Sequence, residues 1–77
     1  MKSNTFELTD FEVATILIIE GFNLLEVDKS NPHKASFIFE NNPRIAEVIN
    51  SYFNDKLSVN PRMLFMESKT LKNRLYL

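Results

Sequence analysis

The sequence predicts an α+β domain in which helices pack on a small antiparallel sheet. Short runs rich in β-branched and aromatic residues alternate with longer segments of helical periodicity, and turn or cap residues separate them. The chain has 77 residues, of which 44% are hydrophobic and 25% charged, as is typical of one small globular domain. We therefore expect a single domain over residues 1–77 with the element order β-α-β-β-α-(β)-α.

The first strand and helix are predicted from alternation and cap residues. The segment Thr5–Leu8 alternates polar and apolar residues, which is typical of a short half-buried strand. Residues 9–12 match a capping box, in which Thr9 accepts from the backbone N–H of Glu12 and Glu12 reaches back to Thr9. The β-branched run that follows favours a strand by propensity alone, but this cap and the later Gly21 favour a helix over about residues 10–20. A helix so apolar should be buried on more than one face.

The next segments predict a hairpin. Two β-prone runs, residues 22–27 and 34–40, flank a cluster of turn formers. Side chains alternate along a strand, so Phe37 and Phe39 share one face and Ile38 lies on the other. The expected partners of these two phenylalanines on the first run are Leu25 and Val27.

The C-terminal half predicts two helices with the same start signal, an asparagine cap followed by proline. The first begins at Asn42 and Pro43, and its apolar stripe is Ile45, Ile49, Tyr52 and Phe53, joined by Ala46 and Val48. Residues 57–59 predict one very short extra strand. The second helix runs from Pro61 to near Tyr76, with Leu64, Leu71 and Leu75 along one side.

This order of signals resembles a small bacterial and phage domain family of unknown function. The resemblance covers nearly the whole chain and implies a stand-alone domain of this size, encoded by a phage or another mobile element. It implies no activity and no site residue. The segments that carry it are Thr5-x-x-x-Thr9-Asp10, the aliphatic helix closed by Gly21, Phe37-x-Phe39, Tyr52, Leu57-x-Val59-x-Pro61-Arg62 and Leu71-Lys72-x-x-Leu75-Tyr76.

Composition excludes most catalytic chemistry. The chain has no cysteine, one histidine and one glycine, which leaves no thiolate, no zinc ligand set and no glycine-rich phosphate loop. His33 follows Pro32 in a turn, where a solvated imidazole is the ordinary role. We therefore expect a protein that is not an enzyme and that binds no cofactor and no metal.

No segment predicts export or membrane insertion. The N-terminus lacks the apolar core of a signal peptide. The longest apolar run, Val13–Ile19, is far shorter than the roughly 20 residues of a membrane span. We expect a cytoplasmic protein that makes no membrane contact.

Charge is distributed unevenly along a chain whose net charge is −1. Residues 1–28 carry one basic side chain against six acidic ones, and residues 52–77 carry five against two. Helix dipoles explain part of this pattern. One hypothesis is that the last helix contacts phosphates of a nucleic acid, although a pI of 5.7 and a simple solvated helix face argue against it. Its residues are Arg62, Lys69, Lys72 and Arg74.

The leading hypothesis is a non-enzymatic binding module that works through protein–protein contact. A helix offers one stripe to a core, so the last helix has more large apolar residues than its own domain can bury. Exposed together, they would mark a partner site; the alternative is that they wrap the sheet edge and fill the core. A homodimer is the simplest form, and the acidic start and basic end suit an antiparallel or end-to-end approach. The residues are Met63, Phe65, Met66 and Tyr76.

Overall fold

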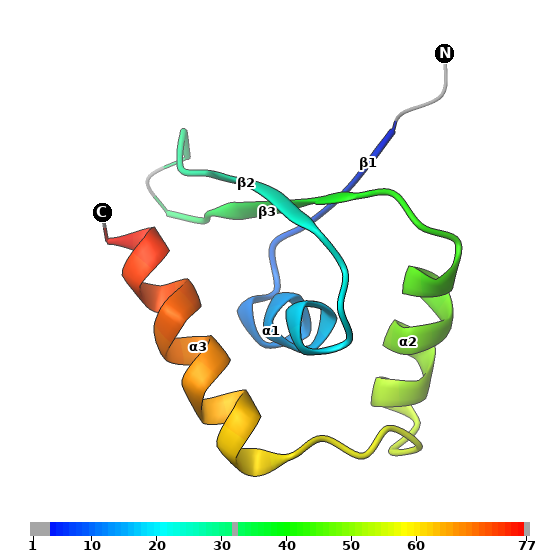
Figure 1. Cartoon of the computed structure of the whole chain (residues 1–77). Coiled ribbons are helices and arrows are strands. Elements are labelled where there is room, and N and C mark those ends of the chain that lie inside the picture. Colours follow the sequence, from blue (N-terminus) through cyan, green and yellow to red (C-terminus); the bar gives the residue numbers. More distant parts are fainter. Residues whose placement is uncertain (1–3, 32, 77) are drawn as a thin grey trace.

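The computed structural model describes residues 4–31 and 33–76. Three strands form one antiparallel sheet and three helices pack beside it, which confirms the α+β fold (Figure 1). Residues 57–59 form no strand, so that expectation was wrong. The elements are β1 (Thr5–Leu8), α1 (Phe11–Ile19), β2 (Leu24–Asp28), β3 (Ser36–Glu40), α2 (Arg44–Phe53) and α3 (Pro61–Leu75).

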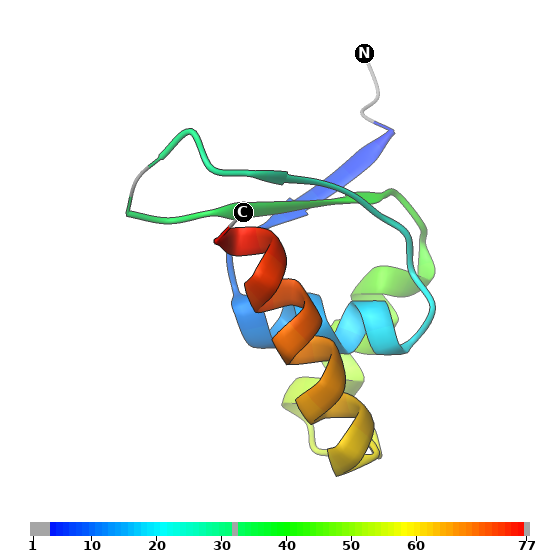
Figure 2. The same cartoon turned by 60° about the vertical axis from the view of Figure 1, so that its left-hand side comes forward.

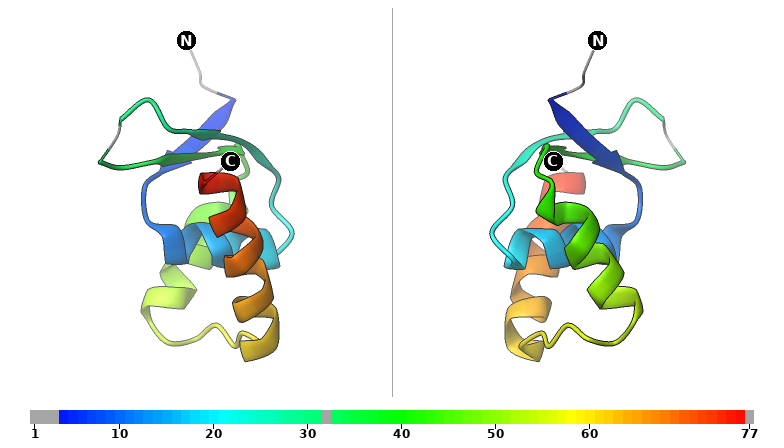
Figure 3. Two further views of the ribbon diagram at one scale, coloured as in Figure 1. Left: turned by 90° about the vertical axis from the view of Figure 1, so that its left-hand side faces the viewer. Right: turned by 90° about the vertical axis from the view of Figure 1, so that its right-hand side faces the viewer.

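The sheet has the strand order β1-β3-β2, and β3 pairs antiparallel with both neighbours. The two outer strands are therefore parallel to each other and are joined through α1, a split β-α-β arrangement. Helix α1 lies beneath the sheet, with α2 and α3 on either side of it (Figures 1 and 3). The opposite face of the sheet carries no other element of the described chain (Figure 2).

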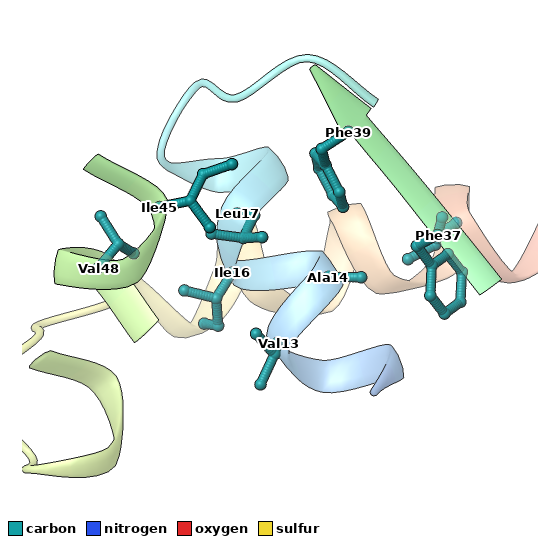
Figure 4. Packing of buried hydrophobic residues seen from close by; sticks show 9 residues of the cluster. Val13, Ala14, Ile16, Leu17, Phe37, Phe39, Ile45 and Val48 are labelled. Atoms are coloured by element: carbon teal, nitrogen blue, oxygen red, sulfur yellow. The ribbon is translucent and has the colours of Figure 1, made fainter. Parts of the chain in front are cut away.

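The core forms around α1. Residues Val13–Leu17 are buried without interruption, because the sheet, α2 and α3 each cover a different side of this helix (Figure 4). This confirms the expectation that α1 is buried on more than one face. The other buried apolar residues are Phe37 and Phe39 of β3, Ile45 and Val48 of α2, and Leu71 of α3.

The N-terminal cap of α1 differs from the expected capping box. Asp10, not Thr9, is the cap, and its Oδ1 accepts from the backbone N–H of Val13 at 3.1 Å. Glu12 does not reach back to Thr9, because its carboxylate accepts a hydrogen bond from the Tyr52 hydroxyl on α2. A tertiary partner thus takes the place of the local one.

The hairpin register differs from the expected one at a single residue. Leu24 pairs with Phe39 and Val27 pairs with Phe37, and a β-bulge separates Leu24 from Glu26. Val27 is therefore a core partner as expected, whereas Leu25 is 52% exposed and is not. The bulge adds one residue to β2 and so moves Leu25 to the open side of the strand.

The cap signals of the other helix ends are largely confirmed. Gly21 has φ +96°, and the N–H of Phe22 donates to the Leu17 carbonyl at 3.0 Å, as in a Schellman motif. Asn60 accepts from the N–H groups of Arg62 and Met63. At α2, the Asn42 side chain accepts from the N–H of Arg44, but Pro43 precedes the first helical residue instead of occupying it.

Helix α2 ends in a second Schellman motif, with an aspartate in the left-handed position. Asp55 has φ +57°, and the N–H of Lys56 donates to the Ser51 carbonyl at 2.8 Å. A side chain at positive φ is strained, and a carboxylate at a helix C-terminus faces the negative end of the dipole. This position therefore favours glycine on two physical grounds.

We predict that Asp55→Gly raises the free energy of unfolding by about 1 kcal/mol, because glycine adopts positive φ without strain. Asp55→Asn should show a smaller gain, since it removes the charge and keeps a side chain.

Gly21→Ala should lower stability by about 1 kcal/mol through backbone strain alone, because nothing lies within 4 Å of the added Cβ. Urea unfolding measures all three, and a destabilised Asp55→Gly variant would contradict this account.

Candidate functional site

Helix α3 contacts the rest of the domain through one side only. Leu71 is buried, and Leu64 and Leu75 are partly buried against the core. The remaining sides of the helix face solvent. Six large apolar side chains of the described chain are exposed, and four of them lie on α3 or at its C-terminal cap: Met63, Phe65, Met66 and Tyr76.

These four side chains do not form one patch. Residues three or four apart lie on the same side of a helix, whereas residues two apart do not. Phe65 and Tyr76 therefore belong to one side of α3, and Met63 and Met66 to another. The expected apolar site residues are all exposed, but the helix divides them into two pairs.

Basic residues share the side of Phe65 and Tyr76. From Phe65 to Tyr76 the spacing is four, three and four residues, which places Lys69 and Lys72 on the line between the two aromatic residues. The Lys69 Nζ lies 5.4 Å from the centre of the Phe65 ring, within cation–π range. We call this line the basic stripe; its members, all exposed, are Arg62, Phe65, Lys69, Lys72 and Tyr76.

Arg74, the fourth base expected at a phosphate site, lies apart from the stripe. Its carbonyl accepts from the Lys29 Nζ at 3.4 Å, which joins the β2–β3 connection to the end of α3. Arg74 also lines a hollow with Glu67 and Leu24, near the start of β2. The structure thus brings three of the four expected bases together.

The β2–β3 connection adds two residues that sequence reasoning did not place near α3. Tyr76 lines the same surface hollow as His33 and Lys34, so the stripe continues from the helix onto this connection. Both residues are exposed. No local signal could have found this neighbourhood, because it depends on where the connection lies relative to the end of α3.

The outer face of the sheet is acidic. Glu7 on β1 and Glu26 on β2 lie directly opposite Ile38 of β3, one on each side, and Glu40 ends β3. None of the three strands contains a basic residue. The bulge in β2 adds exposed Leu25. We call Glu7, Glu26, Glu40, Ile38 and Leu25 the acidic sheet face.

The hydroxyl groups inside the fold are already engaged. The buried Thr15 hydroxyl donates to the Phe11 carbonyl at 2.9 Å, and the Ser68 hydroxyl donates to the Leu64 carbonyl. Such bonds to the preceding helical turn satisfy a hydroxyl without activating it. Within the described residues, no three acidic or histidine side chains group in a way that could hold a metal ion.

No helix in the described part of the chain has the length and apolar character needed to cross a lipid bilayer.

A family model described as domain of unknown function DUF5659 matches residues 3–77. The chain belongs to this family. The match confirms the resemblance, drawn from the sequence, to a domain family of unknown function that covers nearly the whole chain. No curated protein and no solved structure matches this DUF5659 chain.

We predict that the carboxyl pKa of Asp28, at the base of the connection that carries His33 and Lys34, lies below its usual value. The N–H of Ser30 donates to Asp28 Oδ1 at 2.9 Å, and this bond, with a smaller contribution from the Ser30 hydroxyl, lowers the pKa. The bonds favour the ionised form, so their contribution is present above the ordinary pKa and is lost as the pH falls through the lowered one.

Carboxyl NMR titration of the DUF5659 domain measures this value directly. Ser30→Ala should raise the Asp28 pKa only part of the way, because the backbone donor remains. Ser58→Ala, in the connection between α2 and α3, is the matched control. An ordinary Asp28 pKa in the unmodified chain would contradict the predicted arrangement.

Proposed function

We propose that this domain is a non-enzymatic binding module that works in the cytoplasm through protein–protein contact at the exposed sides of α3. The sequence resemblance further supports a role as an accessory or inhibitory protein of a phage or another mobile element. The observation that carries the binding proposal is the arrangement of α3, which packs through one leucine side and leaves four large apolar side chains in water.

The physical argument concerns the free energy of hydration. Apolar surface removed from water stabilises a complex by roughly 25 cal/mol per Å², so exposed Phe65 and Met66 represent unused binding energy. They lie on a regular helix, so little backbone entropy is lost when a partner covers them. Aromatic residues and methionine are also enriched at protein interfaces.

The bases of the stripe restrict the kind of partner. Arg62 and Lys69 flank Phe65 along the stripe, so a partner surface needs carboxylates around an apolar centre. A positively charged partner would be repelled. The expected partner of this side of α3 is therefore an acidic protein surface.

We predict that Phe65→Ser abolishes partner binding while Phe53→Ser leaves it intact. The two phenylalanines are a matched pair, because each is 64% exposed and each lies on a helix, α3 and α2 respectively. Each substitution removes one phenyl ring, and the two rings have the same exposed fraction. Binding is measured by quantitative capture from the native cell and by sedimentation velocity of the purified chain, with urea unfolding to show that both variants fold.

Only proteins, including the chain itself, that are retained by Phe53→Ser and lost by Phe65→Ser count as partners of α3. Met66→Glu should reduce the same binding if the methionine side also contributes. If no protein distinguishes the two serine variants, α3 is not the binding surface.

A second candidate function is binding of a nucleic acid, preferably single-stranded. The alternation of Phe65 and Tyr76 with lysines favours it, because stacking rings beside phosphate-binding bases are the usual elements of single-strand recognition. Lys34 continues the positive track beyond Tyr76, and His33 lines the same hollow. The acidic sheet face would limit such contact to the α3 side of the molecule.

We predict for this candidate that Lys69→Glu with Lys72→Glu weakens binding to all sequences alike, because phosphate contacts carry no sequence information. Affinity should also fall steeply with salt as counterions are released. Fluorescence anisotropy with single-stranded and duplex oligonucleotides at low salt measures both effects, and Lys56→Glu, an exposed base outside α3, is the control. Absence of binding at low salt would eliminate this function.

A further inference from the structure

We infer that the acidic sheet face is the receptor for the basic stripe of a second copy of this chain, so that the protein self-associates through α3 on one copy and the sheet on the next. This inference rests on the proposed function and names its partner. Four observations carry it: the segregation of charge, the match of lengths, the apolar centres, and the placement of the two surfaces.

The first observation is that each surface carries charge of one sign. Strands in a sheet lie about 4.8 Å apart, so Glu7 and Glu26 on either side of Ile38 are about 10 Å apart, within the range of mutual repulsion at low salt. No base of the three strands offsets them. The basic stripe likewise contains no acid. A chain of net charge −1 therefore has two surfaces of opposite sign.

The second observation is the agreement in size. The stripe extends from Arg62 to Tyr76, about 21 Å at 1.5 Å per residue. A five-residue strand spans about 17 Å at 3.3–3.4 Å per residue. Across the strands, the roughly 10 Å between Glu7 and Glu26 is close to the rise of about 10.5 Å along the helix axis from Arg62 to Lys69, so these two bases can lie above the two glutamates.

The third observation is that both surfaces have an apolar centre. Ile38 lies between the two glutamates, and the β-bulge adds Leu25, which is 52% exposed. On the helix, Phe65 lies between Arg62 and Lys69, and Tyr76 ends the stripe beyond Lys72. Exposed ion pairs contribute little free energy, so burial of these four side chains provides most of the affinity and the charges determine the orientation.

The fourth observation concerns symmetry. The outer sheet face and the exposed side of α3 lie on different sides of the molecule, so one copy can offer both at once (Figures 1 and 2). Such a contact is head-to-tail and leads to a ring or a chain of copies, in contrast to a two-fold dimer. A two-fold contact between basic stripes would instead bring Arg62, Lys69 and Lys72 against like charges.

The test reverses the charge of one surface at a time and then mixes the two variants. The stripe-reversed variant carries Lys69→Glu and Lys72→Glu, and the sheet-reversed variant carries Glu7→Lys and Glu26→Lys. Sedimentation velocity at low salt should show concentration-dependent assembly of the unmodified 9.0 kDa chain, which weakens as salt is added. Each variant alone should associate at least about tenfold more weakly, because like charges then meet.

An equimolar mixture of the two variants should assemble again, because every stripe then meets a sheet of opposite sign. A single chain with all four substitutions should also self-associate. Lys56→Glu with Glu47→Lys, two exposed residues outside both surfaces, is the matched control and should behave as the unmodified chain. Glu7→Gln with Glu26→Gln provides a milder sheet variant if the reversed one does not fold.

The outcomes separate this inference from the proposed function. If the reversed variants do not associate alone and also do not associate when mixed, the stripe does not contact the sheet, and the inference is overturned. If self-association is lost in the stripe-reversed variant but kept in both sheet variants, the inference is also overturned. In that case α3 remains a binding surface, but its partner is not the sheet. An unmodified chain that stays at 9.0 kDa overturns self-association alone, because the Phe65 and Phe53 comparison tests other partners independently.

Discussion

The enclosure of α1 is the constraint on which the rest of the structure depends. Residues Val13–Leu17 bury side chains in every direction, so no single neighbour can cover this helix. The sheet covers one side through Phe37 and Phe39, α2 covers another, and α3 supplies Leu71 (Figure 4). A domain of 77 residues thereby uses all of its elements as one layer around a central helix. Among the described residues, no further layer covers the outer surfaces of these elements.

This arrangement explains why the candidate surfaces are where they are. An element that surrounds a central helix is apolar on its inner side, and its outer side is free to carry any chemistry that water tolerates. In this chain the outer side of the sheet is acidic and the outer side of α3 is basic with aromatic residues among the bases. The two surfaces follow from the same packing and need no pocket between elements. The proposed recognition by surface contact is consistent with this arrangement.

The features predicted from sequence are those with a local physical cause. The left-handed Gly21, the Asn60 cap and the alternation of Thr5–Leu8 each depend on a few neighbouring atoms, and each is confirmed. The failures depend on partners distant in sequence. Glu12 bonds to Tyr52 instead of its own cap, and Leu57 and Val59 pack partly buried near the core without meeting a strand edge. A bulge, which alternation cannot indicate, displaced Leu25. The separation of the apolar residues of α3 into two pairs has a local cause, because helical spacing alone already places Met63 and Phe65 on different sides.

The position of Leu71 in the core also affects how the chain folds during synthesis. About 40 residues separate α1 from α3, and at roughly 5–20 residues per second the ribosome needs several seconds to make them. Throughout that interval the most apolar segment of the protein lacks one of its three covers. Until the last helix emerges, burial of this segment in the nascent chain therefore depends on the sheet and α2 alone.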